Sequence, residues 1–164
     1  MTGHISDAMR SVLGKEFASA TSFPVAASDI RRWAMAVYYP EPPPSPFWDT
    51  SEGQTLTAPR DFNPFAWMTT SGPSARPGHY DPDRNFKALG VDGPGLTRQV
   101  NGGLEVSYGV PMRVGDVITS SSCISALTER EGRLGLMLFT TVETVWTNQD
   151  NHEVRRQKTT IIRY

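Results

Sequence analysis

Alternation of apolar and polar residues in the C-terminal part of the chain restricts the fold more than any other feature. From Leu104 to Met112, apolar residues alternate with polar ones such as Glu105, and this period of two favours a half-buried β-strand. Comparable patterns predict four strands, over residues 104–112, 117–127, 134–147 and 153–163. Turn-forming residues fill the connections 129–132 and 148–151, so we expect antiparallel hairpins within a four-strand meander.

Two helices and a strand are predicted before this sheet. Ser6 can cap a short helix, and residues 17–25 read as a strand whose Pro24 favours a sheet edge or a strand end. Ser28 can cap a second helix over residues 28–38. Its apolar residues recur at helical spacing: Ile30, Trp33, Ala34, Val37 and Tyr38. We expect this apolar face to pack against the sheet in an α+β fold.

Residues 40–102 form a long crossover between these two parts and hold 11 of the 13 prolines. A Pro-rich segment of this length is uncommon in a compact domain and is usually functional or disordered. Its aromatic residues argue against disorder, because they can bury enough area to hold the segment down. They are Phe47, Trp48, Phe62, Phe65 and Trp67. We expect Asn63-Pro64 to cap a short helix and residues 72–95 to be looser and surface-exposed.

The composition is that of a globular chain, with 164 residues of which 38% are hydrophobic and 20% charged. A single domain over residues 1–164 is expected. A net charge of −1 gives no reason to expect nucleic acid or a membrane surface as a partner. Without a transmembrane run or an export signal, we expect a cytoplasmic protein with no membrane insertion. The lone Cys123 excludes an internal disulfide and a multi-cysteine zinc site, and we expect no metal and no cofactor.

Four stretches carry a resemblance to a known family: SDIRRWAMAV (28–37), PMRVGDVI (111–118), GLMLF (135–139) and TNQD (147–150). In their order and spacing they resemble the MaoC-like dehydratase superfamily, in particular its N-terminal, fatty-acid-synthase-like dehydratase domain. The resemblance covers most of the chain, from residue 15 to residue 164. It implies a single hot-dog fold, in which an antiparallel sheet wraps around a helix, here with a long Pro-rich crossover.

The family also implies a mechanism that this chain carries only in part. An aspartate and a histidine activate the water that adds to the double bond of an enoyl thioester, and backbone N–H groups hold the thioester oxygen. The stretch DFNPFA, Asp61 to Ala66, resembles the family's Asp-x-Asn-Pro-hydrophobic-His signature, but alanine occupies the histidine position. Asp61 is thus the one catalytic candidate, and the alternative is that it belongs to a capped turn that anchors Phe65 and Trp67.

The remaining candidates concern substrate binding. The family places a glycine-bearing turn near the thioester, and Asn101, Gly102 and Gly103 match it, although an ordinary turn is equally compatible. Aromatic residues would form the wall of an acyl-accepting cavity: Tyr38, Phe47, Trp48, Phe62, Phe65 and Trp67, with Trp33 either there or in the core. No other group replaces the missing histidine. We expect His4 in a frayed terminus, His152 in a hairpin turn and His79 in a solvated loop, and we expect Cys123 to be a buried structural residue.

These absences favour a non-catalytic, acyl-chain-accommodating subunit of a heteromeric (R)-specific enoyl-CoA hydratase or 3-hydroxyacyl thioester dehydratase. The resemblance implies an acyl-CoA or acyl-carrier thioester as substrate. It also implies a catalytic MaoC-like hot-dog partner, in a heterodimer or heterotetramer, that supplies the aspartate and histidine. One alternative is a self-sufficient homodimeric hydratase or thioesterase that uses Asp61, Asp49 or Glu41 as its base. The other is a non-enzymatic acyl-CoA binding module.

Overall fold

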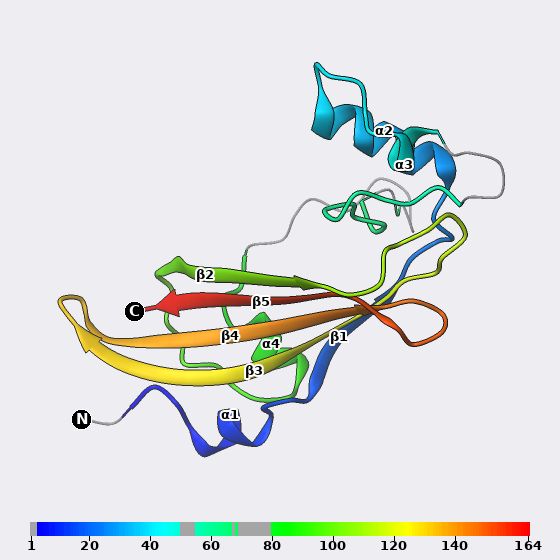
Figure 1. Cartoon of the computed structure of the whole chain (residues 1–164). Coiled ribbons are helices and arrows are strands. Elements are labelled where there is room, and N and C mark those ends of the chain that lie inside the picture. The colour runs from blue at the N-terminus through cyan, green and yellow to red at the C-terminus, as the bar shows by residue number, and fades with distance from the viewer. Residues whose placement is uncertain (1–2, 50–54, 67, 69–79) are drawn as a thin grey trace.

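One antiparallel sheet of five strands organises the molecule (Figure 1). The structure is a computed structural model that describes residues 3–49, 55–66, 68 and 80–164. The strands are β1 Glu16–Thr21, β2 Gln99–Tyr108, β3 Thr119–Gly132, β4 Gly135–Thr147 and β5 Glu153–Arg163. Their order across the sheet is β1-β3-β4-β5-β2. β1 is therefore an edge strand, as Pro24 shortly after its end suggests.

Strands β3, β4 and β5 follow one another through the two predicted hairpins. The β3–β4 pairing begins with Thr119 opposite Thr147 and runs to the turn between the strands. In the β4–β5 turn, the side-chain oxygen of Asn148 accepts hydrogen bonds from the backbone N–H groups of Asp150 (3.1 Å) and His152 (2.9 Å). An asparagine that bonds its own turn in this way fixes the connection locally. Both antiparallel hairpins are confirmed, as is the turn over residues 148–151. The predicted turn over residues 129–132 is wrong, because these residues pair with β4 as part of β3 and the chain turns at residues 133–134.

The predicted four-strand meander is wrong, because β2 pairs with β5 and not with β3. The backbone N–H groups of Gly109 and Val110 donate to the carbonyl oxygens of Val154 and Glu153, each at 2.9 Å, so this pairing continues past the end of β2. The chain then crosses the ends of β5 and β4 before it enters β3 (Figure 1). β2 is consequently the second edge of the sheet, and within the described residues no strand pairs with its outer side.

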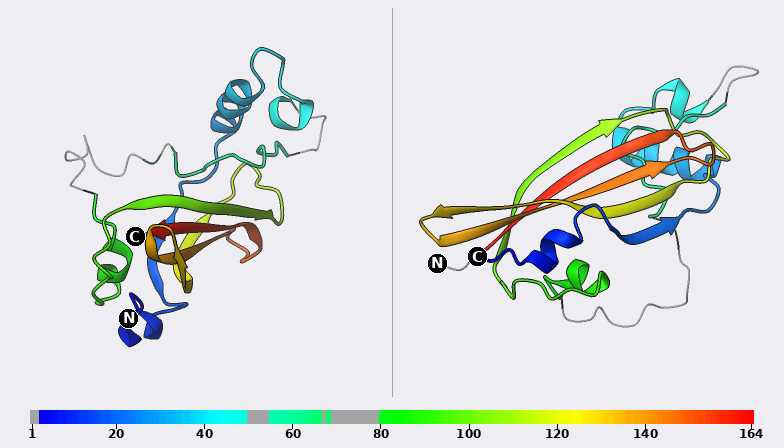
Figure 2. Two further views of the ribbon diagram at one scale, coloured as in Figure 1. Left: turned by 90° about the vertical axis from the view of Figure 1, so that its left-hand side faces the viewer. Right: turned by 90° about the horizontal axis from the view of Figure 1, so that it is seen from below.

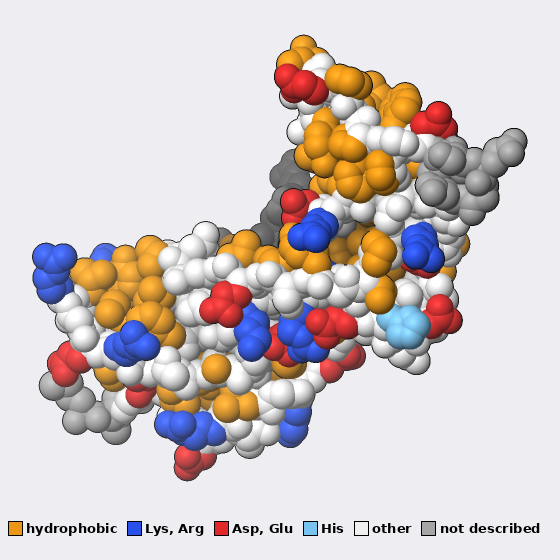
Figure 3. Space-filling model, in the orientation of Figure 1, with side chains coloured by type: hydrophobic (Ala, Val, Ile, Leu, Met, Phe, Trp, Pro, Cys, Tyr) orange, Lys and Arg blue, Asp and Glu red, His pale blue; other side chains and the backbone are white. Residues whose placement is uncertain are grey.

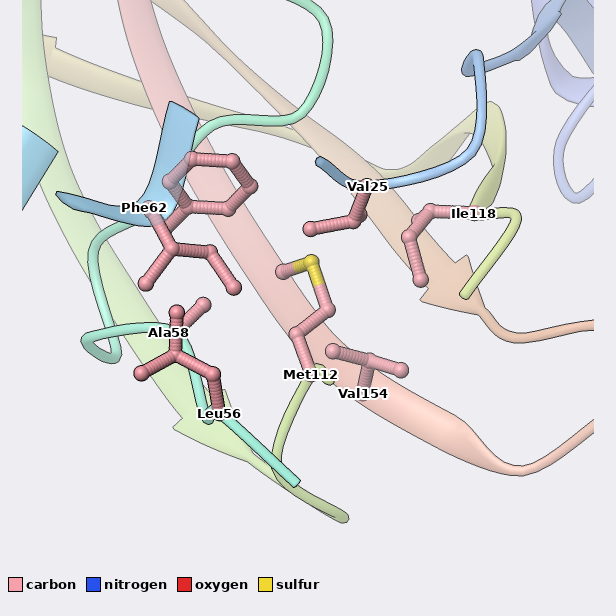
Figure 4. Close-up of a cluster of buried hydrophobic side chains, with 8 residues drawn as sticks. Val25, Leu56, Ala58, Phe62, Met112, Ile118 and Val154 are labelled. Atoms are coloured by element: carbon pink, nitrogen blue, oxygen red, sulfur yellow. The ribbon is translucent and has the colours of Figure 1, made fainter. Parts of the chain in front are cut away.

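Residues distant in sequence close one end of the sheet in a hydrophobic cluster (Figure 4). Its buried members are Val25, Ile30, Leu56, Ala58, Phe62, Met112, Ile118 and Val154. The backbone N–H of Ala58 donates to the carbonyl oxygen of Met112 (2.9 Å), which ties the crossover to the β2–β3 connection. Burial of these apolar side chains is what holds this part of the Pro-rich crossover in place.

Helix α2, Ala27–Tyr38, begins two residues before the start that a Ser28 cap predicts. Its N-cap is Ala26, which has no side-chain oxygen and makes no capping hydrogen bond. The hydroxyl of Ser28 donates to the carboxylate of Asp29 (3.5 Å) instead. The predicted Ser28 cap is therefore wrong, and burial of the first half of α2 replaces it as the source of stability.

The predicted packing of α2 against the sheet holds only for its first half. Ile30 is fully buried in the cluster at the end of the sheet, whereas Val37 is 54% exposed. Helix α3, Ser45–Trp48, covers part of the second half, where the rings of Tyr38 and Phe47 stack with their centroids 5.9 Å apart. We call α2 and α3 together the α2–α3 arm. It stands away from the sheet on the side of the β2 edge (Figures 1 and 2).

Two short helices, α1 Asp7–Ser11 and α4 Arg84–Ala88, lie against the sheet near its other end (Figure 2). The Ser6 hydroxyl accepts a hydrogen bond from the Met9 backbone N–H (3.2 Å), which confirms the predicted cap. The buried residues of this second cluster are Met9, Val12, Phe86, Ile124, Leu127 and Leu138. The expectation of an exposed, loose segment is wrong for α4, since Phe86 is 1% exposed. Among the described helices, none is long and apolar enough to cross a membrane.

A buried ion pair joins α4 to the last strand. Arg163 of β5 donates to the carboxylate of Asp83 (2.6 Å) and to the carbonyl oxygen of Pro82 (3.1 Å). The second carboxylate oxygen of Asp83 accepts from the backbone N–H of Gly95 (3.0 Å). The Arg163 side chain is only 3% exposed. Since both charges are hydrogen-bonded, the pair fixes the two ends of the α4 segment on the sheet.

Substitution of Arg163 by alanine tests this anchor. We expect Arg163→Ala to lower the free energy of unfolding by about 3–5 kcal/mol, because it leaves the Asp83 carboxylate buried without its cation. Arg32→Ala is the matched control: its ion pair with Asp29 has the arginine side chain 65% exposed, and such pairs contribute at most about 1 kcal/mol. Urea denaturation of both variants measures the difference, and equal losses would contradict the anchoring role.

Candidate functional site

A cavity of 410 Å³ lies between the crossover and the end of β2, beside the sequence motif that contains Asp61. Ala58, Pro59 and Arg60 line it from the crossover. Residues 106–112 line it from β2 and the connection that follows, and Val154 lines it from β5. The β2–β5 pairing places these segments together, although 47 positions separate Asp61 from Tyr108.

Asp61 and Tyr108 form the central polar contact beside this cavity. The Tyr108 hydroxyl donates to the Asp61 carboxylate at 2.6 Å. This hydrogen bond raises the pKa of Tyr108 above its ordinary value, because ionisation of the phenol would remove the donated proton beside a carboxylate. Burial and the Asp61 charge act in the same direction, and the cations of Arg155 and Arg60 oppose them. Tyr108 is thus held as a neutral hydrogen-bond donor.

Two arginines lie over the Tyr108 ring. The guanidinium carbon of Arg60 is 5.7 Å from the ring centroid and that of Arg155 is 5.9 Å away. Arg155 also lies 4.9 Å from the centroid of Trp146, and its side chain donates to Gln157 (2.9 Å). The Nε of Arg155 is buried without a hydrogen-bond partner, and within the described residues Arg155 forms no ion pair. Its positive charge is therefore not neutralised by a carboxylate of the described residues.

The DFNPFA stretch itself folds as a turn. The Asn63 side-chain oxygen accepts from the Phe65 backbone N–H (3.0 Å), and the Asn63 carbonyl accepts from the Ala66 N–H (3.2 Å). The turn sets Phe65 against Trp146, with ring centroids 5.3 Å apart. Directly after Asn63-Pro64, the described residues 65, 66 and 68 are not helical, and the rest of the segment predicted as a short helix lies outside the described residues. A capped turn that anchors Phe65 is confirmed, its predicted second anchor Trp67 lies outside the described residues, and a catalytic role for Asp61 stays a prediction.

The predicted wall residues fall into separate places. Phe62 is 1% exposed and packs edge-on against Trp33, at a centroid distance of 5.7 Å, within the core. Tyr38, Phe47 and Trp48 belong to the α2–α3 arm. Among the described members of the set, Phe65 is the one that packs against Trp146, the ring over which Arg155 lies. Trp67 lies outside the described residues, as does His79.

Residues 101–103 lie within β2, so the turn predicted before the strand is wrong. The register shifts between Asn101 and Gly103, which marks a β-bulge. A side chain at Gly102 would meet Ile162 of the neighbouring strand, 2.8 Å from its Cγ1. Close packing on β5 accounts for this glycine. Asn101 pairs with Ile161, six positions along β5 from the Arg155 that pairs with Tyr108, so these residues are not brought to the Asp61 cavity.

The histidines that the structure describes lie elsewhere. The expected fraying at His4 is wrong, because its ring is hydrogen-bonded to the carbonyl of Leu136 (3.0 Å) and its backbone N–H donates to Glu129. His152 occupies the β4–β5 turn, as expected. Cys123 is partly buried, and burial together with the Glu143 charge raises the pKa of its thiol, which opposes nucleophilic use. Within the described residues, the site therefore offers a carboxylate, a phenol and two guanidinium groups, and no imidazole.

Comparison with known proteins agrees with this architecture. The family described as FAS1-like, dehydratase domain region, matches residues 11–157. The chain belongs to this family. No curated protein matches the sequence of this FAS1-like dehydratase domain.

Solved structures show that the domain has the hot-dog fold of MaoC-like dehydratases. The ChsH1-ChsH2 complex from Mycobacterium tuberculosis aligns over 92% of this chain and 89% of that chain, with a TM-score of 0.63 and 16% identity. The MaoC-like dehydratase from Rhodospirillum rubrum aligns over 93% and 92%, with a TM-score of 0.54 and 21% identity. The HadBC (3R-hydroxyacyl-ACP dehydratase) complex from M. tuberculosis aligns over 92% and 99%, with a TM-score of 0.50 and 18% identity. The expected α+β hot-dog fold is confirmed.

Titration of Tyr108 tests the electrostatics of the site. Since the hydrogen bond to Asp61 is the main cause of the raised pKa, Asp61→Asn should move the Tyr108 pKa back toward its ordinary value near 10. The raised pKa also means that the contribution of this contact to stability is present below pH 10 and is lost as the pH rises through the folded-state pKa. Ultraviolet absorbance titration, with Tyr108→Phe to assign the signal, measures the shift. An unchanged titration in Asp61→Asn would contradict the assigned contact.

Proposed function

We propose that this domain is the non-catalytic, acyl-chain-accommodating subunit of a heteromeric (R)-specific enoyl-CoA hydratase or 3-hydroxyacyl thioester dehydratase. It acts in the cytoplasm as one domain over residues 1–164, and a partner MaoC-like subunit supplies the catalytic aspartate and histidine. One observation carries the proposal: among the described residues, Asp61 has a phenol and two guanidinium groups beside it but no histidine. A carboxylate without an imidazole lacks half of the acid/base pair that hydration needs.

The open edge of the sheet supports a partner of the same fold. β2 is ten residues long and ends the strand order, so its outer N–H and C=O groups are available to a further strand. Apolar side chains lie along it, with Val100 47% and Leu104 62% exposed. An exposed edge of this length and composition favours strand addition from another chain.

The α2–α3 arm extends the same surface. It projects past the β2 edge, and hydrophobic side chains gather on it (Figure 3). Met35, Val37 and Trp48 contribute, with exposed fractions of 54%, 54% and 41%. A partner domain that adds its strand to β2 would meet the arm as well, which would bury apolar area on both elements. The ChsH1-ChsH2 and HadBC structures are themselves complexes of two different chains, which favours a heteromeric arrangement here.

The substrate in this proposal is an acyl-CoA or acyl-carrier thioester, and no cofactor takes part. Arg60 and Arg155 suit the anionic groups of such a carrier, because guanidinium groups bind phosphate oxygens strongly. We place the acyl chain along the aromatic residues singled out in the sequence, Tyr38, Phe47, Trp48, Phe65 and Trp67, with Phe62 behind them in the core. Asn101, Gly102 and Gly103 lie farther along β2, away from the Asp61 cavity, and take no direct part in this site.

Hydration of crotonyl-CoA and of longer enoyl-CoA thioesters tests the proposal. The domain is assayed alone and with a co-expressed MaoC-like subunit whose sequence carries Asp-x-Asn-Pro-x-His, taken from a neighbouring reading frame. Loss of the enoyl thioester absorbance should be seen only with the pair. It should disappear when the partner's motif histidine is changed to alanine, and Asp61→Asn in this chain should leave the rate of the pair within about twofold.

A self-sufficient homodimeric hydratase or thioesterase is the second candidate, and the Asp61–Tyr108 contact beside the 410 Å³ cavity favours it. Asp61 would then be the base and Tyr108 a hydrogen-bond donor. Turnover by the domain alone that falls at least about a hundredfold in Asp61→Asn would establish this candidate and reject the heteromeric one. Asp92→Asn, an exposed carboxylate near α4, is the matched control and should leave any turnover unchanged.

Charge placed on the β2 edge tests the partner surface separately from catalysis. Leu104→Lys should weaken association with the partner by at least about tenfold, because a lysine on an edge strand opposes strand addition. Leu134→Lys is the control, since Leu134 is equally exposed, at 62%, but lies in the β3–β4 turn. Sedimentation velocity of the mixed subunits gives both affinities. Equal affinities for the two variants would contradict the placement of the partner on β2.

A further inference from the structure

A second cavity, of 330 Å³, lies between α4 and the face of the sheet that α4 covers (Figure 2). None of the residues that line the cavity beside Asp61 lines this one. Apolar side chains form much of its wall: Phe17, Phe86, Val142 and Ile161. Its volume is at the lower end of the range for small-molecule sites, so it suits a short ligand with an apolar body.

Two polar side chains of α4 line this cavity without a partner. Arg84 is exposed, and within the described residues its side chain forms no ion pair and no hydrogen bond. Its guanidinium carbon lies 5.3 Å from the centroid of the Tyr80 ring. A ring contact of this kind holds a guanidinium in place and leaves its charge and its N–H donors available. The half-buried side-chain amide of Asn85 likewise has no hydrogen bond to any described residue.

The charged groups next to Arg84 are matched among themselves. The Asp81 carboxylate is 2.7 Å from the Lys87 ammonium, and the Asp83 carboxylate is 2.6 Å from the Arg163 guanidinium. Both carboxylates of the segment that leads into α4 therefore have a cation of their own. The positive charge of Arg84 is left uncompensated at the wall of the cavity.

The other polar side chains of the wall offer less to a ligand. Three hydrogen bonds engage most of them: Tyr80 with Gln99 (3.0 Å), Gln157 with Thr159 (3.1 Å) and Ser122 with Thr144 (2.8 Å). The Thr140 hydroxyl has no partner, but its oxygen is buried beyond the reach of a ligand. The guanidinium of Arg84 and the amide of Asn85 are thus the polar groups of this wall that a ligand can use.

These two groups select a carboxylate. The planar fork of a guanidinium matches the two oxygens of a carboxylate, and an amide N–H can donate to the same oxygens. One free cation balances one negative charge. A phosphate dianion would need a second cation, and Lys87 and Arg163 already have carboxylate partners. The apolar wall then contacts the remainder of the ligand.

We propose that the cavity beside α4 is a binding site for a small apolar monocarboxylic acid. The carboxylate binds Arg84 and Asn85, and the hydrocarbon part lies against Phe86, Val142 and Ile161. The ligand is the free acid, without a thioester carrier. The site is separate from the one beside Asp61, and the inference does not depend on the proposed function.

Calorimetry of the full chain with octanoate and octanamide, which differ in charge and hardly in shape, tests the inference. Octanoate should bind at least about tenfold more tightly, the gain expected of hydrogen bonds to a charged group. Among shorter acids, affinity should rise about fourfold with each methylene added, until the cavity is filled. Arg84→Gln should abolish the preference for the acid. Arg133→Gln, which removes an exposed arginine of the β3–β4 turn, is the matched control and should leave the preference intact.

Methyl NMR of the same chain locates the bound acid. Octanoate should shift the resonances of Val142 and Ile161, which line the cavity beside α4, and leave those of Val106 and Val110, which line the cavity beside Asp61. The inference is overturned if octanoate does not bind or shifts only the second pair. Equal affinity for acid and amide, or a preference that survives Arg84→Gln, overturns it as well. None of these readouts uses turnover, so neither result decides the proposed function.

Discussion

The pairing of β2 with β5 is the interaction on which the rest of the structure depends. It sets Tyr108 beside Arg155, which in turn pairs with Trp146 of β4, so one row across three strands carries the phenol, the guanidinium and the indole of the site. It also brings Asp61 of the crossover against Tyr108. Because β2 then has no described strand on its outer side, the same pairing that builds the site also leaves the edge where a second chain can add.

The sequence predicts the elements whose signal is local. The β3–β4 and β4–β5 hairpins combine alternating strands with turn residues, and Ser6 caps α1 through its own hydroxyl. The fold class follows from this order of elements and from the resemblance to MaoC-like dehydratases. Asp61 is likewise found from a contiguous sequence motif. The residues around it in the structure, Tyr108 and Arg155, belong to no such motif.

The sequence-based predictions fail for elements whose structure is determined by tertiary contacts. Helix α4 has five residues and no side-chain cap, so its own sequence gives almost no helical signal; burial of Phe86 and the Asp83–Arg163 pair hold it in place. β2 starts at Gln99, before the apolar alternation, because Gly102 allows close packing on Ile162. Its partner strand is not encoded in its own residues, and neither is the contact between Asp61 and Tyr108.

The central claim is that this domain shapes the acyl site while another subunit moves the protons. The structure of the co-purified assembly with a non-reactive enoyl thioester analogue bound is the most direct measurement. The account predicts that the carboxylate and the imidazole beside the double bond both come from the partner, with the acyl group lying against this chain. A carboxylate from Asp61 with an imidazole from this chain or from an identical copy, both at the double bond, would contradict it.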